Sequence, residues 1–337
     1  SAAFAISQLS QQQKSPVLVV TPDTASALKM HAEIDSLLKE HKQNAHFFPD
    51  WETLAYDTFS PHQDIISQRL HTLHNLQQRS GVYIVSINTL MMRMAPVDFI
   101  GQYSLILNQG DKLDIDSMRG RLVQSGYRLV DQVMEHGEFS IRGSLLDLYP
   151  MGSNQPYRID FFDDEVDSIR VFDPETQRSG DTIKTVDLLP AHEFPTDDAG
   201  IEKFRQNWRA QFEPSTDKES IYYQVSKKIM PAGIEYYLPL FFEQTSSLFE
   251  HLPAQTTILF TDKIQGAATH FIDEVNKRYE NRRFDKSRPL LEPKQLFLSV
   301  DQLFSGLKQF ARIEFTSQNL DEKPGRFNFS IEAIDDI

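Results

Sequence analysis

Cysteine is absent from this sequence of 337 residues. Its absence excludes disulfides, thiolate nucleophiles, cysteine-ligated zinc and iron–sulfur clusters. It also fits a reducing compartment, so we expect a cytoplasmic protein. Long apolar runs are absent as well, because none approaches the roughly 18–20 residues that a membrane-spanning helix needs. No basic segment followed by a short apolar block opens the chain as a secretory signal would. We therefore expect no membrane partner.

Basic residues are outnumbered by acidic ones. Lys and Arg total 34 against 48 Asp and Glu, which gives a net charge of −14. A surface that grips DNA phosphates regardless of base sequence needs dense Lys and Arg. The charge balance therefore argues against such a surface.

Motifs for several common chemistries are missing. The sequence has no G-x-x-x-x-G-K-S/T loop for phosphates, no G-x-G-x-x-G for a dinucleotide, no H-E-x-x-H for zinc and no G-x-S-x-G for a nucleophilic serine. His71 and His74 could share a metal, but a histidine pair without a third ligand is more typical of a solvated helix face. Asp163-Asp164-Glu165 is more typical of a hydrated turn than of an acid/base cluster. We expect no catalytic residue, no cofactor and no metal.

The first hundred residues alternate strand and helix patterns. Short apolar runs at 16–20, 46–49 and 81–86 predict buried strands. An apolar stripe over 24–38 predicts a helix. Ser60-Pro61 predicts the start of another helix, with Ser60 as its cap. Strands alternating with helices predict a parallel α/β sheet.

The pattern changes near residue 103 and changes back near 190. A helix over 114–126 precedes short alternating runs at 139–142, 157–162 and 166–172, which predict an α+β unit with an antiparallel sheet. After 190, helices and buried strands at 257–261 and 313–315 continue a second α/β pattern. We predict three domains: an α/β domain at 1–103, an inserted α+β domain at 104–190, and a second α/β part at 191–337 that ends in a polar tail.

One strand of the inserted domain carries an unusual surface pattern. Because side chains alternate along a strand, Tyr157, Ile159 and Phe161 share one face, which should pack on the helix at 114–126. Arg158, Asp160 and Phe162 share the other face. A phenylalanine beside an arginine on an otherwise charged face resembles a protein-binding hot spot.

Neighbouring strands extend this pattern. Arg142 points outward on an earlier strand, and Ser168, Arg170 and Phe172 repeat the mixture on the next one. An alternative stays open: Phe162 could pack against a neighbouring domain while the arginines pair with nearby acids. The 9 basic and 16 acidic residues between 104 and 190 make a nucleic-acid surface the weaker interpretation.

Several longer stretches resemble the amino-terminal region of the bacterial transcription-repair coupling factors, the Mfd family. The resemblance covers nearly the whole chain and is weakest beyond about Ser317. It is carried by Phe48-Pro49-Asp50-Trp51-Glu52-Thr53-Leu54, Phe59-Ser60-Pro61-His62-Gln63-Asp64-Ile65-Ile66, Val130-Asp131-Gln132-Val133-Met134-Glu135-His136-Gly137-Glu138, Asp160-Phe161-Phe162-Asp163-Asp164-Glu165 and Leu189-Pro190-Ala191-His192-Glu193-Phe194-Pro195.

The resemblance implies a fold shared with the repair helicase UvrB, with two helicase-type α/β parts and an inserted domain. Two departures from UvrB imply a degenerate relative. The start of the chain has no Gly and Lys where UvrB has its P-loop, and the stretch from Trp51 to Pro61 is too short for the aromatic hairpin that holds damaged DNA. We therefore expect no enzymatic activity from this chain, although full-length members of the family are ATP-dependent DNA translocases.

The resemblance also implies a partner. In this family the inserted domain docks the damage-recognition ATPase UvrA, and the contact positions fall on Arg142, Arg158 and Phe162, with Arg170 and Phe172 at the periphery. The arginines would meet UvrA carboxylates, and Phe162 would fill an apolar socket.

Further partners are implied for the full-length protein. It binds RNA polymerase and double-stranded DNA through other domains, and a C-terminal domain covers the UvrA-binding face. Two alternatives remain: a nucleotide-dependent DNA-binding domain in its own right, and a purely autoinhibitory structural domain.

Overall fold

A computed structural model describes residues 2–39, 44–76, 80–261, 263–316, 320–321 and 323–326. The predicted polar tail lies almost entirely outside these residues. Within them, no helix combines the length and apolar character needed to cross a membrane.

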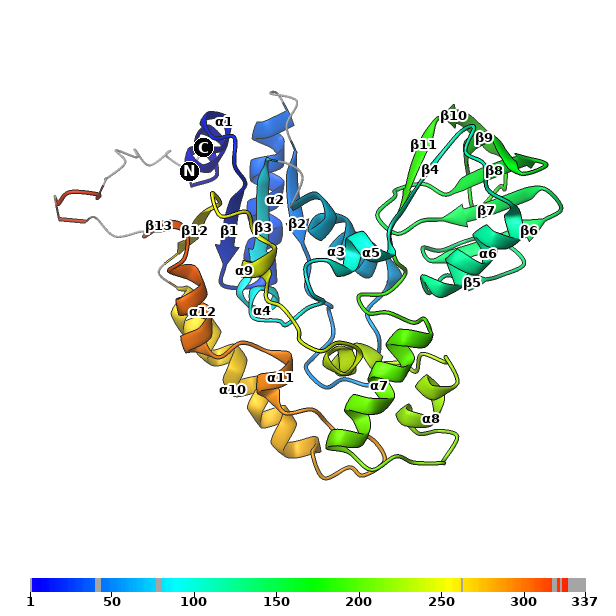
Figure 1. The fold of residues 1–337 in the computed structure, drawn as a ribbon. Coiled ribbons are helices and arrows are strands. Elements are labelled where there is room, and N and C mark those ends of the chain that lie inside the picture. Colours follow the sequence, from blue (N-terminus) through cyan, green and yellow to red (C-terminus); the bar gives the residue numbers. More distant parts are fainter. Residues whose placement is uncertain are drawn as a thin grey trace.

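Two stretches of the chain, one before and one after the inserted domain, build a single parallel sheet (Figure 1). The strand order is β13-β12-β1-β3-β2. Every neighbouring pair is parallel, and β1 lies between β12 and β3, with Val17 opposite both Thr257 and Val82. The strands are β1 (Val17–Thr21), β2 (Ala45–Phe48), β3 (Val82–Ser86), β12 (Thr257–Thr261) and β13 (Ala311–Phe315).

Helices flank this sheet and follow its strands, as the apolar patterns predict. Every residue of β1 is buried, and α2 buries Ala27, Ile34 and Leu38, so the strand and helix bury complementary apolar surfaces. The helices of the first stretch are α1 (Ala2–Gln12), α2 (Thr24–Lys39), α3 (Gln63–Leu76), α4 (Ile87–Leu90) and α5 (Phe99–Tyr103). Those of the last stretch are α7 (Asp198–Gln211), α8 (Ile221–Ser226), the 3-10 helix η1 (Ile234–Phe241), α9 (Leu248–His251), α10 (Ile264–Arg282), α11 (Pro293–Leu296) and α12 (Val300–Leu307).

The predicted α/β chain interrupted by an α+β unit is confirmed, and the structure adds that both α/β stretches share one sheet. The reason is topological. The chain leaves through β4 and returns through β11, and these two strands pair antiparallel along their whole length. The inserted unit therefore projects to one side of the parallel sheet (Figure 1).

The inserted unit contains a six-stranded sheet and one helix in addition to the β4–β11 pair. Its strand order is β10-β9-β8-β7-β6-β5. Met118 and Leu122 of the helix are buried in the same apolar cluster as the inner face of the sheet. The elements are β4 (Leu105–Asn108), α6 (Ile115–Gln124), β5 (Arg128–Leu129), β6 (Glu138–Arg142), β7 (Leu145–Tyr149), β8 (Tyr157–Phe162), β9 (Glu165–Phe172), β10 (Ser179–Ile183) and β11 (Thr185–Leu188).

The predicted helix cap at Ser60 is wrong. Helix α3 begins at Gln63, three residues later. The Ser60 hydroxyl instead donates to Glu235 Oε2 at 2.8 Å and accepts from the backbone amide of Gly233 at 2.9 Å. A long-range contact, invisible to local sequence pattern, uses the side chain that a capping box would need.

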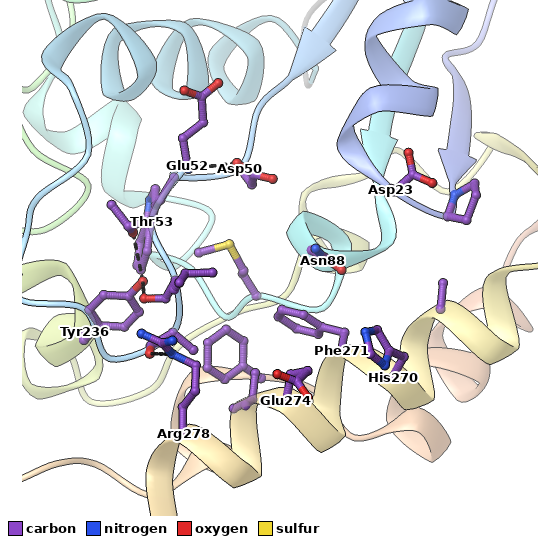
Figure 2. A pocket seen from close by; sticks show the side chains of 18 residues that line it. Asp23, Asp50, Glu52, Thr53, Asn88, Tyr236, His270, Phe271, Glu274 and Arg278 are labelled. Carbon is purple, nitrogen blue, oxygen red and sulfur yellow. Dashed lines mark hydrogen bonds between the residues drawn. The ribbon is translucent and has the colours of Figure 1, made fainter. Parts of the chain in front are cut away.

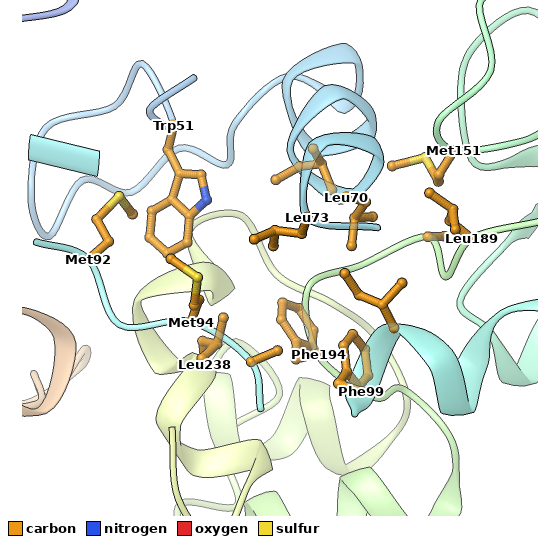
Figure 3. Packing of buried hydrophobic residues seen from close by; sticks show 14 of the residues in the cluster. Trp51, Leu70, Leu73, Met92, Met94, Phe99, Met151, Leu189, Phe194 and Leu238 are labelled. Atoms are coloured by element: carbon orange, nitrogen blue, oxygen red, sulfur yellow. The ribbon is translucent and has the colours of Figure 1, made fainter. Parts of the chain in front are cut away.

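An apolar cluster joins the inserted domain to the rest of the molecule. Leu70 of α3 faces Met151 and Leu189 from the inserted domain, and Leu73 of α3 and Leu238 of η1 belong to the same cluster (Figure 3). Trp51 and Trp208 are 4% and 2% exposed, so both indole rings are packed in the core.

Three buried charged residues lie beside this cluster. Arg69 and Glu193 are fully buried and paired at 2.9 Å, and Trp51 donates its indole N–H to Glu193 at 2.7 Å. Glu235 lies close enough to Glu193 for repulsion. Burial, more than that repulsion, raises the pKa of Glu235 to about 7. The contact between the inserted domain and the rest of the molecule, called the junction below, therefore contains the Arg69–Glu193 ion pair and the Glu235 carboxyl, which is partly neutral near pH 7.

The raised pKa makes stability depend on pH. Glu235 binds its proton more tightly in the folded chain than in the unfolded chain, whose value is near 4.5. Its contribution is therefore complete below pH 4.5 and is lost as the pH rises through about 7, by about 3 kcal/mol in all. In thermal melts between pH 5 and 8, Glu235→Gln should remove this part of the decline. The exposed control Glu175→Gln should keep the wild-type slope, and an unchanged slope for Glu235→Gln would contradict the assignment.

Candidate protein-binding face

The outward residues predicted from strand alternation lie on one face of the six-stranded sheet. Ser140, Asp147, Arg158 and Arg170 are directly opposite one another on four successive strands. Residues that face each other across a ladder point to the same side of a sheet. The next row contains Arg142, and Phe162 lies two residues beyond Asp160 on β8. We call this side of the sheet the mixed face.

The opposite side of the same strands is core. Ile159 is fully buried and Phe161 is 5% exposed, whereas Phe162 is 79% exposed. The predicted division of β8 into an apolar inner face and an outward face is confirmed. The expectation that Phe162 is outward is confirmed with it, and the alternative that Phe162 packs against another domain is wrong for this chain.

Phe162 stands on a well-anchored backbone. It ends β8 at a tight turn in which Asp163 has a φ of 57°. Backbone hydrogen bonds hold this turn from the segment before α6: Leu113 N donates to Asp164 O at 2.7 Å, and Gly110 N donates to Val166 O at 2.8 Å. An exposed aromatic ring on a fixed backbone loses little conformational entropy when a partner covers it.

Arg158 is occupied within the chain. Its Nε and Nη2 donate to the two carboxylate oxygens of Asp147 at 2.7 and 2.9 Å, and its Nη1 donates to Gln177 O and Ser179 Oγ. The hydrogen bond to Asp147 raises the pKa of the guanidinium above its ordinary value. The side chain is 17% exposed. Asp147 therefore occupies the Arg158 fork within this chain, and the contact of Arg158 with a UvrA carboxylate stays a prediction.

Arg142 and Arg170 are more accessible. The side chain of Arg142 is 53% exposed and makes one ion pair, from Nη2 to Asp147. Arg170 is exposed, and its side chain has no ion pair or hydrogen bond within the described part of the chain. Together with Phe162, these two cations form the open part of the mixed face.

Phe172 does not belong to the accessible surface. It points to the same side as Arg158 but is only 4% exposed, and the Arg158 guanidinium lies 5.0 Å from its ring centroid. The turn after β9 covers this end of the face, since Gln177 bonds both Arg158 and the carbonyl of Val133. The expectation that Phe172 is an outward residue is corrected. Strand alternation correctly predicts the side of the sheet on which Phe172 lies, but it does not predict that the turn after β9 covers the ring.

The residue that sequence reasoning undervalued is Asp147. It is 1% exposed and pairs with both Arg142 and Arg158. A carboxylate within a strand near arginines is more typical of a structural ion pair than of catalysis, and Asp147 forms such pairs. Its position opposite Arg158 could have been inferred only by knowing the register of β7 against β8.

A cleft lies at the carboxyl ends of the parallel strands, where open α/β sheets usually bind ligands. It has a volume of about 590 Å³ and is lined by the segments after β1 and β2 and by α10 (Figure 2). Asp23 accepts from the backbone amide of Ser26 at 2.7 Å, and Asp50 accepts from the Thr24 hydroxyl. Carboxylates thus occupy the start of α2, where a nucleotide fold would present bare amides to phosphate.

Nothing in the described residues gathers three potential metal ligands. The stretch from Trp51 to Pro61 forms turns against α10, where Arg278 donates to Ala55 O and Arg282 donates to Tyr56 O.

Comparison with known proteins agrees with this architecture. Residues 105–194 match the UvrB interaction domain family. Over 99% of its length the chain is 47% identical to the transcription-repair-coupling factors of Escherichia coli and Haemophilus influenzae. The transcription-repair-coupling factor of Bacillus subtilis is 27% identical over 89% of the chain. The chain spans 29% of the length of the first two relatives and 26% of the third.

The six-stranded sheet with its mixed face lies within the residues that match the UvrB interaction domain family, and the molecule as a whole is a mixed α/β module. Similarity continues through the parallel sheet on both sides of that domain. The chain belongs to the transcription-repair-coupling factor family, and the resemblance inferred from its residues is confirmed.

Proposed function

We propose that this chain is a non-catalytic module that recruits UvrA through the mixed face of its UvrB interaction domain. The observation that carries the proposal is Phe162. It is the most exposed large apolar side chain of the described residues, and it shares the mixed face with the accessible cations Arg142 on β6 and Arg170 on β9. Aromatic and arginine anchors of this kind dominate protein–protein binding energies.

The accessible set differs from the one expected at first. Arg142, Phe162 and Arg170 can touch a partner directly, whereas Arg158 contributes from beneath them. A complementary partner surface would carry carboxylates around an apolar socket. The inserted domain as a whole is acidic, so attraction to such a surface depends on these local cations and not on net charge.

The wider setting is part of the same proposal. By resemblance to the family, the full-length protein would bring UvrA to a stalled RNA polymerase and move on double-stranded DNA through other domains. A C-terminal domain would cover the mixed face until activation. A purely autoinhibitory role for this module can coexist with recruitment.

A competition experiment tests the proposal. The chain is titrated into UvrA that carries fluorescently labelled UvrB, in the absence of DNA. The resemblance to UvrB implies that UvrB docks UvrA through its corresponding domain, so both proteins would use one UvrA surface. The chain should therefore release UvrB with a saturable midpoint. Direct calorimetry of the chain with UvrA should give one binding site per UvrA protomer. A chain that neither binds UvrA nor displaces UvrB would remove the proposed function.

The rival function is that of a nucleotide-dependent DNA-binding domain. The carboxylates at the start of α2 argue against it. Phosphate would approach Asp23 and Asp50 there instead of free amides. Millimolar ATP with magnesium should therefore leave the melting temperature unchanged, because only a ligand that binds the folded state raises it. A clear, saturable rise in melting temperature would revive the rival.

A further inference from the structure

Asp147 is a buried member of the mixed face and contacts two of its arginines. Its Oδ1 accepts from Arg158 Nε at 2.7 Å, and its Oδ2 accepts from Nη2 of both Arg158 and Arg142. The carboxylate is 1% exposed, so its charge depends on these partners for compensation. One buried carboxylate on β7 thus holds an arginine on β6 and another on β8.

The two arginines use Asp147 differently. Arg158 gives it a bidentate contact and has its remaining nitrogen bonded to Gln177 O and Ser179 Oγ. Arg142 gives it one nitrogen only, which fixes the direction of the side chain. The other nitrogens of Arg142 remain available, and the side chain is half exposed.

We propose that Asp147 is the positioning residue of the mixed face. It holds Arg142 so that its free nitrogens face the partner, and it holds Arg158 as a support for the surface and not as a direct contact. The proposal rests on the proposed UvrA-binding function. Within that function it assigns direct contact to Arg142 and structural support to Arg158.

The sign of the charge separates positioning from simple attraction. Replacing Asp147 with asparagine removes one negative charge from beneath two cations. If only net charge mattered, an acidic partner surface would bind the variant more tightly. If Asp147 positions the arginines, the variant binds more weakly despite its more favourable charge.

The experiment is a titration of UvrA with the wild-type chain, Asp147→Asn and the control Asp187→Asn. Asp187 is exposed on β11, outside the six-stranded sheet, and its replacement changes the net charge equally. Asp147→Asn should weaken binding about tenfold or more, and Asp187→Asn should not weaken it. Equal or tighter binding by a folded Asp147→Asn would overturn the inference while leaving UvrA recruitment intact. Failure of the wild-type chain to bind would remove the proposed function instead.

A second variant covers the case in which Asp147→Asn does not fold. Arg142→Lys changes a half-exposed side chain and keeps its charge, but a single ammonium group cannot span Asp147 and a partner carboxylate as a planar guanidinium does. It should therefore bind UvrA several-fold more weakly than the wild type at an unchanged melting temperature. Wild-type affinity for Arg142→Lys would overturn the inference.

The arrangement also has a signature in the free chain. The Nε–H of Arg158 should give a slowly exchanging guanidinium resonance, because it donates to a buried carboxylate. In Asp147→Asn this protection should fall. Fast exchange of that proton in the wild-type chain would contradict the positioning role without any reference to UvrA.

Discussion

Phe162→Ala should weaken UvrA binding by about 2 kcal/mol or more, which is roughly 30-fold in Kd. The ring is 79% exposed in the free chain, so its removal costs little folding energy. A partner that covers it would lose most of the apolar area that the ring brings to the interface. Titration calorimetry with UvrA measures the loss, and a thermal melt of the variant should match the wild type.

Phe59→Ala is the matched control for this experiment. Phe59 is 68% exposed but lies in the loop before α3, away from the six-stranded sheet. It presents a ring of the same size to solvent, so its loss tests whether any exposed phenylalanine matters. Binding should be unchanged in Phe59→Ala. If Phe162→Ala bound UvrA as tightly as the wild type, Phe162 would not be part of the interface.

Arg69→Met should destabilise the folded chain by about 3–5 kcal/mol. The guanidinium is 1% exposed, pairs with Glu193, donates to Pro49 O at 2.6 Å and lies 4.6 Å from the ring centroid of Phe48. Methionine fills much of the volume but leaves Glu193 as a buried charge without its partner. Urea unfolding, followed by tryptophan fluorescence, measures the change because Trp51 donates to the same carboxylate.

Two further variants make this result specific. Arg283→Met breaks a solvent-exposed pair with Glu280 and should change stability by no more than about 0.5 kcal/mol. The double variant Arg69→Met with Glu193→Gln removes both charges and should recover part of the loss. A loss below about 1 kcal/mol for Arg69→Met alone would show that the pair contributes little to the junction.

The two predictions concern different properties of the molecule. Phe162 is exposed and should matter to a partner, whereas Arg69 is buried and should matter to the attachment of the inserted domain. Arg69 on α3 reaches Glu193 in the segment between β11 and α7, so the pair connects the parallel body with the returning chain. Weakening this ion pair should therefore loosen the attachment of the inserted domain to the parallel sheet.

Much of the mixed face was predictable because a strand has a period of two. Alternation alone put Arg158 and Phe162 on the side opposite Ile159, and burial confirms that division. Alternation also gave the correct side for Phe172. It failed for the accessibility of that ring, because the turn around Gln177 folds over it from a segment outside the strand.

Ion pairing in the face was less predictable. The acidic neighbours of Arg158 were evident in the sequence, but several could have paired with it. Only the antiparallel register, with Asp147 directly opposite Arg158, selects one. Likewise, Ser60 had every local feature of a helix cap and was recruited instead by Glu235, 175 residues away.

The amino-acid sequence by itself determined the α/β pattern, the inserted antiparallel unit, the family and the side of the sheet on which each key residue lies. These properties follow from local periodicity and from motifs that are read along the chain. The tertiary structure decided that both α/β stretches share one sheet, that Arg142 and Arg170 are more accessible than Arg158, and that Phe172 is covered. These properties depend on strand register and on loops packing from distant segments, and neither is encoded in a local pattern of residues.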